Sequence, residues 1–240
     1  MMSGMTPPSA ARTARERARA EITSMILATA RAHLADNGAS ALSLRSVARD
    51  LGMTSSAVYR YFPSRDDLLT ALLVQVYDEL GEHAEAADAA APAGSTFRER
   101  WRVIATSIRS WALEHHHDYA LLYGSPVPGY AAPEETIGPA SRIPVLLISL
   151  LRQIHESGRD PGETPTARRV PAHVQHSLRG LREFAGPYLS DDLLVRGLMA
   201  WTHVYGAISF ELFGHLVGAV EEYDVWFNHQ VDRLADMIEL

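Results

Sequence analysis

The chain of 240 residues has neither cysteine nor lysine, and it has no apolar run that is both long and free of charge. Without cysteine it forms no disulfide, no thiolate metal site and no thiol nucleophile. Its longest strongly apolar run, Ile143–Leu151, is too short to span a bilayer. Gly197–Val220 is long enough but carries Glu211 and two histidines, which favours a buried helix. The first twenty residues lack the apolar core of a secretory signal. We therefore expect a cytoplasmic protein with no membrane partner.

Motifs that would indicate an enzyme are also missing. The sequence has no glycine-rich phosphate loop, no nucleophile elbow and no zinc-protease motif. His173 and His176 have a spacing at which two histidines on a helix could share a metal, but no third ligand accompanies them. We expect no enzymatic activity, no metal and no cofactor.

Because lysine is absent, all 22 fixed positive side chains are arginines, and their distribution is uneven. Residues 1–65 hold nine arginines and four acidic residues, a net charge of +5. The remaining residues hold thirteen arginines and twenty-five acidic residues, a net charge of −12. A basic end on an acidic body indicates that one end meets a polyanion while the rest has another task.

The hydrophobic periodicity predicts an all-α fold, since no stretch alternates as a strand would. Asn37-Gly38 predicts a helix end, Thr54 a helix start, and Ser64 with Asp67 resembles a capping box. The alanine-rich stretch 84–95 is interpreted as a boundary. The domains expected are 13–82, including a connecting helix over 64–82, and 83–240. The expected helices cover about 22–34, 44–51, 54–62, 64–80, 96–116, 134–156, 170–184, 191–216 and 221–239.

The segment Leu44–Leu69, LRSVARDLGMTSSAVYRYFPSRDDLL, meets the physical demands of a helix-turn-helix. A first short helix can dock through its apolar face, and Gly52 allows the backbone angles of a tight turn. Val58 and Phe62 would hold a second short helix. That arrangement leaves Ser55, Ser56, Tyr59 and Arg60 outward, and Arg45, Arg49, Arg60 and Arg65 supply charge for a phosphate backbone.

This segment resembles the DNA-binding signature of the TetR (tetracycline repressor) family over about residues 15–82. The positions that carry the resemblance are Gly52, Tyr59, Tyr61, Phe62, Ser64, Arg65, Leu68 and Leu69. One departure is Arg65, where lysine is commoner in the family. The resemblance implies an N-terminal three-helix DNA-binding domain followed by a C-terminal helical domain for ligand binding and dimerisation.

The resemblance also implies individual roles in binding double-stranded DNA. Thr54, Ser55 and Ser56 would open the recognition helix. Tyr59 and Tyr61 would contact phosphates or bases, Arg65 would hold a phosphate, and Ser43 and Arg45 would touch the backbone from the preceding helix. Arg60 joins this set through its outward position. Four further arginines are interpreted as a solvated tail before the first helix or as an arm that follows the phosphates: Arg12, Arg15, Arg17 and Arg19.

The last two expected helices carry stripes that favour a homodimer. A heptad-like seam runs along the first of them, and a second stripe of mostly small residues lies beside it. The seam consists of Leu194, Leu198, Trp201, Tyr205, Ile208 and Leu212. With the stripe of the last helix, these predict a four-helix interface between two copies, which is also the family's usual arrangement. A two-fold dimer reads a palindromic operator.

The central helices are rich in aromatic residues, which suits either a packed core or an apolar ligand pocket. Given the resemblance, we expect a pocket, with a wall formed by Trp101, Ile104, Ile108, Trp111, Leu122, Tyr123, Trp201 and Tyr205. The function predicted is a ligand-responsive transcriptional regulator, a repressor released from a palindromic operator by a small apolar or aromatic effector. The alternative is a DNA-binding regulator without a small-molecule effector.

Overall fold

The computed structural model describes residues 10–157, 169–238 and 240, and all regular elements in these residues are helices. The predicted all-α class is confirmed. The chain divides into two compact units. The first combines the residues up to Val76 with Ala120–Thr136, and the second combines Tyr77–Tyr119 with Ile137–Leu240. Among the described residues, no helix is both long and apolar enough to cross a membrane.

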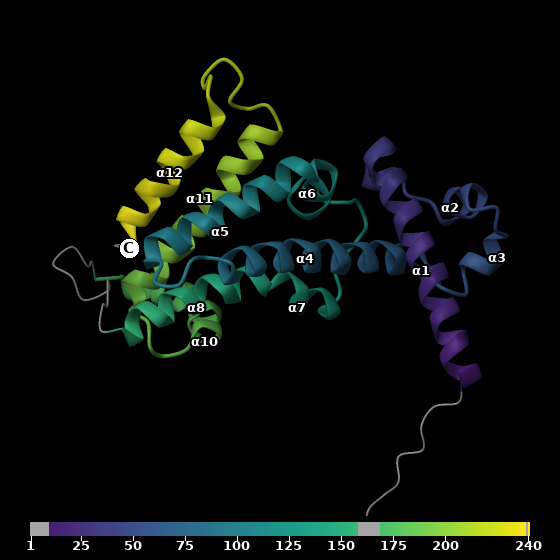
Figure 1. The fold of residues 1–240 in the computed structure, drawn as a ribbon, viewed down its shortest axis with the longest axis horizontal. Coiled ribbons are helices and arrows are strands. Elements are labelled where there is room, and N and C mark those ends of the chain that lie inside the picture. Colours follow the sequence, from purple (N-terminus) through teal and green to yellow (C-terminus); the bar gives the residue numbers. More distant parts are fainter. Residues whose placement is uncertain (1–9, 158–168, 239) are drawn as a thin grey trace, which may run out of the picture. The chain divides into compact units, whose positions relative to one another are not determined.

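The first unit is built on the long helix α1 (Ala10–Asn37), against which α2 (Leu44–Asp50) packs, and α2 in turn packs against α3 (Ser55–Val58) (Figure 1). α1 contains the helix expected over 22–34, and Ile26 and Ala30 on it are fully buried. Gly38 follows α1 with a φ of 74°, and a single 3₁₀ turn, η1 (Ala39–Ala41), leads to α2. The predicted helix end at Gly38 therefore has the left-handed backbone that favours glycine.

The helix α4 (Arg65–Ala89) begins in the first unit and ends in the second. Ser64 precedes it, and the Ser64 hydroxyl accepts from the Asp67 amide at 3.1 Å and donates to the Asp67 carboxylate at 2.7 Å. The alanine-rich stretch 84–89, expected to belong to a boundary, is helical. Alanine is the strongest helix former, and the helix ends shortly before Pro92, where the chain loses a donor.

The second unit is centred on α5 (Phe97–Glu114), which packs against α8 (Arg142–Glu156), α11 (Asp191–Leu212) and α12 (Tyr223–Met237). Thr96 and Glu99 form a capping box at the start of α5, with Thr96 amide to Glu99 carboxylate at 2.7 Å. The start expected at Thr96 is thus confirmed. The remaining elements are α6 (His116–Tyr123), η2 (Glu134–Thr136), α7 (Ile137–Ala140), α9 (Ala172–Ser177) and α10 (Arg179–Ala185).

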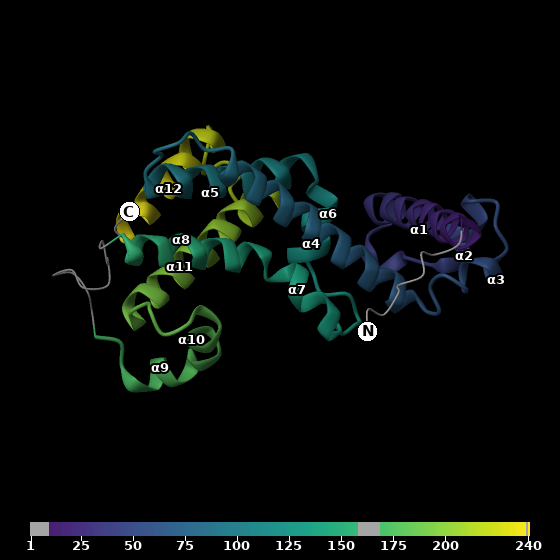
Figure 2. The same cartoon turned by 60° about the horizontal axis from the view of Figure 1, so that its bottom comes forward.

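Two of the expected helices are interrupted. The one expected over 134–156 is divided into η2, α7 and α8, with a turn at Ser141. Pro139 has no amide to donate, so the hydrogen-bond ladder is weakened at this point. The one expected over 170–184 is divided into α9 and α10 at Leu178, whose φ and ψ of −97° and 13° leave the helical region. α9 and α10 form a short pair beside the start of α11 (Figure 2).

Candidate nucleic-acid interface and internal cavity

The turn between α2 and α3 is set by Gly52, whose φ is +65°. The Met53 amide then donates to the Ala48 carbonyl at 2.8 Å, which closes the turn. Thr54 starts α3 as predicted, and its hydroxyl accepts from the Ala57 amide at 3.3 Å. Val58 is fully buried, so it fixes one face of α3 against the unit and leaves the opposite face outward.

The side chains expected to meet DNA gather around this outward face. Thr54, Ser56, Tyr59 and Arg60 are exposed, and Ser55 is half-buried. Tyr59, directly after the last residue of α3, is 42 % exposed. Such exposure of aromatic and hydroxyl groups at a helix end is typical of a binding surface rather than a core.

α2 adds two further groups from the expected set. Ser43 precedes α2 and is half-buried, and its hydroxyl makes no capping hydrogen bond. Arg45 is exposed. Within the described residues, the guanidinium groups of Arg45 and Arg60 have no hydrogen bond or ion pair. Their donors are therefore available to phosphate oxygens, which arginine binds with charge-assisted hydrogen bonds.

Arg65 differs from these two arginines because most of its donors are already engaged. Its Nε donates to the Leu42 carbonyl at 3.2 Å, and Nη2 donates to the Ala39 carbonyl at 2.9 Å. Its Nη1 lies 3.7 Å from the Asp66 carboxylate. Arg65 therefore braces the η1 segment that leads into α2. The phosphate contact expected of it stays a prediction.

The first helix contributes a contact that sequence reasoning missed. Arg15, Arg17 and Arg19 belong to α1, which begins at Ala10, rather than to the expected tail or arm. The Arg12 side chain lies outside the described residues. Arg19 donates to the Arg60 carbonyl at 3.3 Å, and its guanidinium lies 4.9 Å from the centre of the Tyr61 ring. Arg19 thus holds the end of α3 from α1, with the cation over the ring face.

A hydrogen bond ties α1 to α2. His33 Nε2 and Asp50 Oδ2 are 2.6 Å apart, and Arg49 Nε donates to Asp50 Oδ1 at 3.2 Å. The hydrogen bond with His33, helped by Arg49, holds the pKa of Asp50 below its ordinary value of 3.8. The contact fixes α2, and hence the turn that presents α3, against the long helix.

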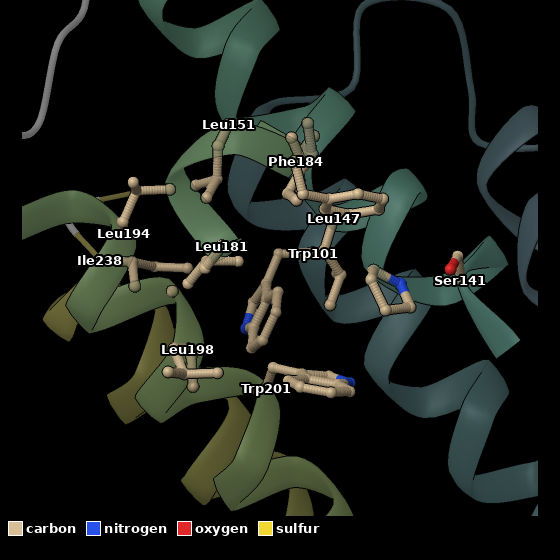
Figure 3. A pocket seen from close by; sticks show the side chains of 15 residues that line it. Trp101, Ser141, Leu147, Leu151, Leu181, Phe184, Leu194, Leu198, Trp201 and Ile238 are labelled. Carbon is tan, nitrogen blue, oxygen red and sulfur yellow. The ribbon is translucent and has the colours of Figure 1, made fainter. Parts of the chain in front are cut away.

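The second unit contains a cavity of about 290 Å³ bounded by α5, α8, α10, α11 and Ile238, which directly follows α12. Figure 3 shows Trp101 and Trp201 lining the same cavity together with several leucine side chains. Phe184 on α10 also lines it and is 49 % exposed, which places this ring at the solvent side. The volume is close to the lower end of the range for small-molecule pockets.

Two of the eight residues predicted for a ligand wall, Trp101 and Trp201, line this cavity. Ile104, Ile108 and Tyr205 line a recess of about 10 Å³ beside the same two indoles. Trp111 is buried on α5 but lines neither space. Leu122 and Tyr123 fall in the Ala120–Thr136 segment of the first unit and are not brought to the cavity of the second.

Most of the cavity wall was not predicted. It comes from aliphatic residues on α8, α10 and α11, including Leu147, Ile148, Leu181, Leu194 and Leu198. The apolar run of α8 and the heptad-like seam of α11 were the available signals, since residues of both line the cavity. A Cβ at Gly197 would lie 3.2 Å from Leu151 Cδ1, so glycine leaves room for the Leu151 side chain.

The start of α8 is also bound to α4 within the second unit. Arg142 donates from Nε and Nη2 to Glu85, at 2.9 and 2.6 Å, and from Nη1 to Asp78 at 3.0 Å. The Arg142 hydrogen bond is the main cause that holds the pKa of Glu85 below its ordinary value of 4.5. A Cβ at Gly81 would lie only 2.7 Å from Arg142 Cδ, so the arginine needs glycine beneath it. Ser141, its neighbour in the chain, lines the cavity.

Residues 26–72 match the family described as "Bacterial regulatory proteins, tetR family", and residues 101–234 match "Tetracyclin repressor-like, C-terminal domain". The chain belongs to the TetR family. It is a DNA-binding transcriptional regulator and not an enzyme. Within the described residues, no group of three or more histidine, aspartate or glutamate side chains could hold a metal ion.

Individual TetR-family relatives agree with this assignment. The HTH-type transcriptional regulators Rv1816 of Mycobacterium tuberculosis and Mb1846 of Mycobacterium bovis are each 38% identical to the chain over 206 residues, which is 83% of this chain and 84% of theirs. Among solved structures, the regulatory protein SCO4313 has a TM-score of 0.72 at 27% identity and covers 96% of this chain and 100% of its own. A protein from Rhodococcus sp. RHA1 shares the fold, with a TM-score of 0.64 at 24% identity over 90% of this chain and 92% of its own.

Proposed function

We propose that the protein is a homodimeric repressor that binds a palindromic operator and leaves it when a small apolar molecule enters the cavity of the second unit. It acts where the DNA is, in the cytoplasm. The observation that carries the effector part is the cavity itself. A filled interior would favour the alternative, a regulator without an effector, whereas an apolar space of about 290 Å³ suits a ligand.

DNA binding follows from the donors that α2 and α3 leave free. Ser55, Ser56, Tyr59 and Arg60 lie around α3, whose first turn enters the major groove in a helix-turn-helix complex. Arg45 has free donors for a phosphate, and Ser43 and Thr54 add hydroxyl groups. In this proposal Tyr61 and Arg65 act beside them, Tyr61 under Arg19 and Arg65 at the start of α4. Phosphate contacts fix the register, and base contacts select the sequence.

Dimerisation follows from the apolar side chains that α11 and α12 expose. The seam predicted from the sequence is used inside the chain, since Tyr205 and Ile208 are buried and Leu198 lines the cavity. The outward residues of α11 include Met199 and Phe210, exposed by 53 % and 54 %.

The last helix and the segment before it continue this apolar surface. The exposed side chains beyond Phe210 are Phe213, Val217, Val225 and Trp226. An apolar surface of this kind on two neighbouring helices suits a self-complementary two-fold interface with a second copy. In the proposal, that interface sets the distance between the two α3 helices.

The effector acts in this proposal by shifting the population between two conformations. Ser141 borders the cavity, and Arg142 directly after it binds α4 through hydrogen bonds to Glu85 and Asp78. A ligand that moves the start of α8 therefore moves the part of α4 that Arg142 holds. Because α4 continues into the first unit, this changes the spacing of the two α3 helices in the dimer.

The test uses a duplex from the region upstream of the protein's own gene, labelled for fluorescence anisotropy. The full-length protein should footprint a two-fold symmetric site, and small apolar compounds should be screened for release. The proposal expects at least one compound that both binds and lowers operator affinity. Compounds that bind the second unit tightly yet leave the anisotropy titration unchanged would contradict the proposal that a small molecule releases the operator. A footprint without two-fold symmetry would contradict the proposal that a dimer binds the operator.

A further inference from the structure

The helix α10 forms one wall of the cavity in the second unit, to which it contributes Leu181 and Phe184 (Figure 3). Among the described residues that line the cavity, Phe184 alone is exposed, by 49 %. The walls on α8 and α11 include Leu150 and Ala200, and both of these residues are only 1 % exposed. Solvent therefore comes nearest to the cavity at α10.

The pair formed by α9 and α10 is held to the second unit by little apolar burial. Neither helix contains a buried residue, whereas α8 and α11 each bury at least four. A helix in a protein is held mainly by the apolar face that it buries. Segments with few buried apolar contacts open at the lowest free energies. We therefore expect α9 and α10 to open more readily than the helices around them.

Polar contacts of one arginine join α10 to the start of α11. Arg182 donates from Nη1 to the Leu189 carbonyl and from Nη2 to the Asp191 carboxylate. Leu189 is 3 % exposed, and Asp191 is the first residue of α11, so both acceptors lie beyond α10 on the side that stays packed. Gly186 ends α10 with a φ of 84°, which glycine adopts at little cost. Arg182 thus bridges the turn at which α10 meets α11.

The other walls of the cavity are tied to further helices. At the start of α8, Arg142 donates to Glu85 and Asp78 of α4. On α5, Trp101 Nε1 donates to the Val231 carbonyl of α12 at 2.9 Å. These walls combine buried apolar residues with contacts to distant parts of the chain. The contacts of Arg182, in contrast, reach no further than nine positions along the chain.

We propose that α10 is the gate of the cavity. It swings outward at Gly186, together with α9, to admit an apolar ligand, and Arg182 latches it to α11 when it is closed. In the closed position Leu181 and Phe184 cover the ligand, as they cover the cavity in this structure. The inference rests on the cavity as the ligand site of the proposed function. It concerns access to the cavity, however, and can be tested without an effector and without DNA.

Because the chain has no cysteine, a single introduced thiol is a clean probe of opening. Ala200 lines the cavity and is 1 % exposed, so Ala200→Cys places a thiol in the wall with little change of volume. Ala112 is fully buried on α5 and does not line the cavity, so Ala112→Cys is the matched control. Both full-length variants are labelled with 4,4′-dithiodipyridine, a neutral aromatic disulfide whose released thiopyridone is followed by its absorbance.

The Ala200→Cys variant should react roughly tenfold faster than Ala112→Cys or more, because a gate opens without unfolding of the unit. Adding Arg182→Gln should raise the rate at position 200 roughly three- to tenfold, the effect of about one lost hydrogen bond. The rate at position 112 should stay within about twofold. Arg179→Gln removes the same charge from the same helix but contacts His176 of α9 instead, and it should leave the rate at position 200 within about twofold.

Equal rates at positions 200 and 112 overturn the gate. Fast labelling at position 200 that does not respond to Arg182→Gln also overturns it, because the cavity is then permanently open. An equal increase at both positions shows a general loss of stability and overturns the latch, as does an equal response to Arg179→Gln. If Arg182→Gln does not fold, as judged by circular dichroism, the comparison of the two thiols without it still decides whether α10 opens.

The proposed function fails separately from the gate. If the thiols react as expected but no compound that binds the cavity lowers operator affinity, the gate stands and the effector role falls. If a compound releases the operator while the thiols at positions 200 and 112 react equally, the effector role stands and the gate falls.

Discussion

Replacing Glu211 with alanine removes the carboxylate that neutralises Arg109 inside the second unit. Arg109 Nε and Nη2 donate to the two Glu211 carboxylate oxygens, both at 2.7 Å, and each side chain is only 11% exposed. The guanidinium also lies 5.1 Å from the centre of the Phe227 ring and reaches Asp224 at 2.7 Å. One arginine of α5 therefore joins α11 to α12.

The expected loss of stability depends on the charges that remain buried after Glu211 is replaced. Removing one partner of a buried ion pair costs about 3–5 kcal/mol, because the other charge stays buried. Asp224 still reaches Arg109, so we expect Glu211→Ala to lower the free energy of unfolding by about 3 kcal/mol, the lower end of that range. Asp224→Ala is the matched control. Its side chain is 83% exposed, and loss of such a pair costs less than about 1 kcal/mol.

Urea unfolding followed by circular dichroism measures both variants. The protein concentration must be equal in all samples, because dimerisation would link stability to concentration. The reasoning is refuted if Glu211→Ala and Asp224→Ala lower the free energy of unfolding equally, or if neither lowers it.

Four further outcomes are expected. Arg65→Ala should lower the free energy of unfolding by about 1–3 kcal/mol, because the η1 segment loses its charged donors. Arg45→Ala should leave the free energy of unfolding unchanged and should reduce the salt slope of DNA binding by about one unit. Equal stability of the two variants would contradict this prediction. Gly81→Ala should displace the arginine above it and weaken ligand-dependent release, whereas release unchanged from wild type would argue against coupling through α4. Phe210→Glu should yield monomers in sedimentation, and an unchanged mass would show that the face carrying Phe210 is not the dimer interface. Burial raises the pKa of Tyr119 to about 12, so its contribution to stability is present below pH 10 and is lost as the pH rises toward 12. Ultraviolet titration should therefore show tyrosine absorbance that still rises near pH 12, and complete titration near pH 10 would refute this.

The local structure of the helix-turn-helix could be predicted because its determinants are short-range. Gly52 has the positive φ that the turn demands, Thr54 caps α3, and Val58 is buried as its position indicated. The bracing role of Arg65 could not be predicted, since its partners Ala39 and Leu42 are more than twenty positions away in the chain. Arg19 was missed for a similar reason, and because the helix that carries it begins earlier than its apolar residues indicate.

The second unit shows why a stripe alone does not identify its partner. The spacing of the seam on α11 favours a dimer, but Leu194, Leu198 and Trp201 line the chain's own cavity. An apolar stripe at helical spacing predicts that one face of the helix is buried, but it does not show whether the same chain or a second copy covers that face. The aromatic residues marked the cavity only in part. Its wall depends on Leu147 and Leu181 as well, and aliphatic residues at these spacings look like those of any core.

The central claim is that α3 and its neighbours read a two-fold symmetric DNA site. Selection from a pool of random duplexes, with the full-length protein at physiological salt, tests this even though the operator sequence is not known. We expect an enriched motif with two inverted half-sites, and loss or relaxation of that motif with Tyr59→Ala and Arg60→Ala. Absence of any enriched motif, or an unchanged motif and affinity in both variants, would contradict the account.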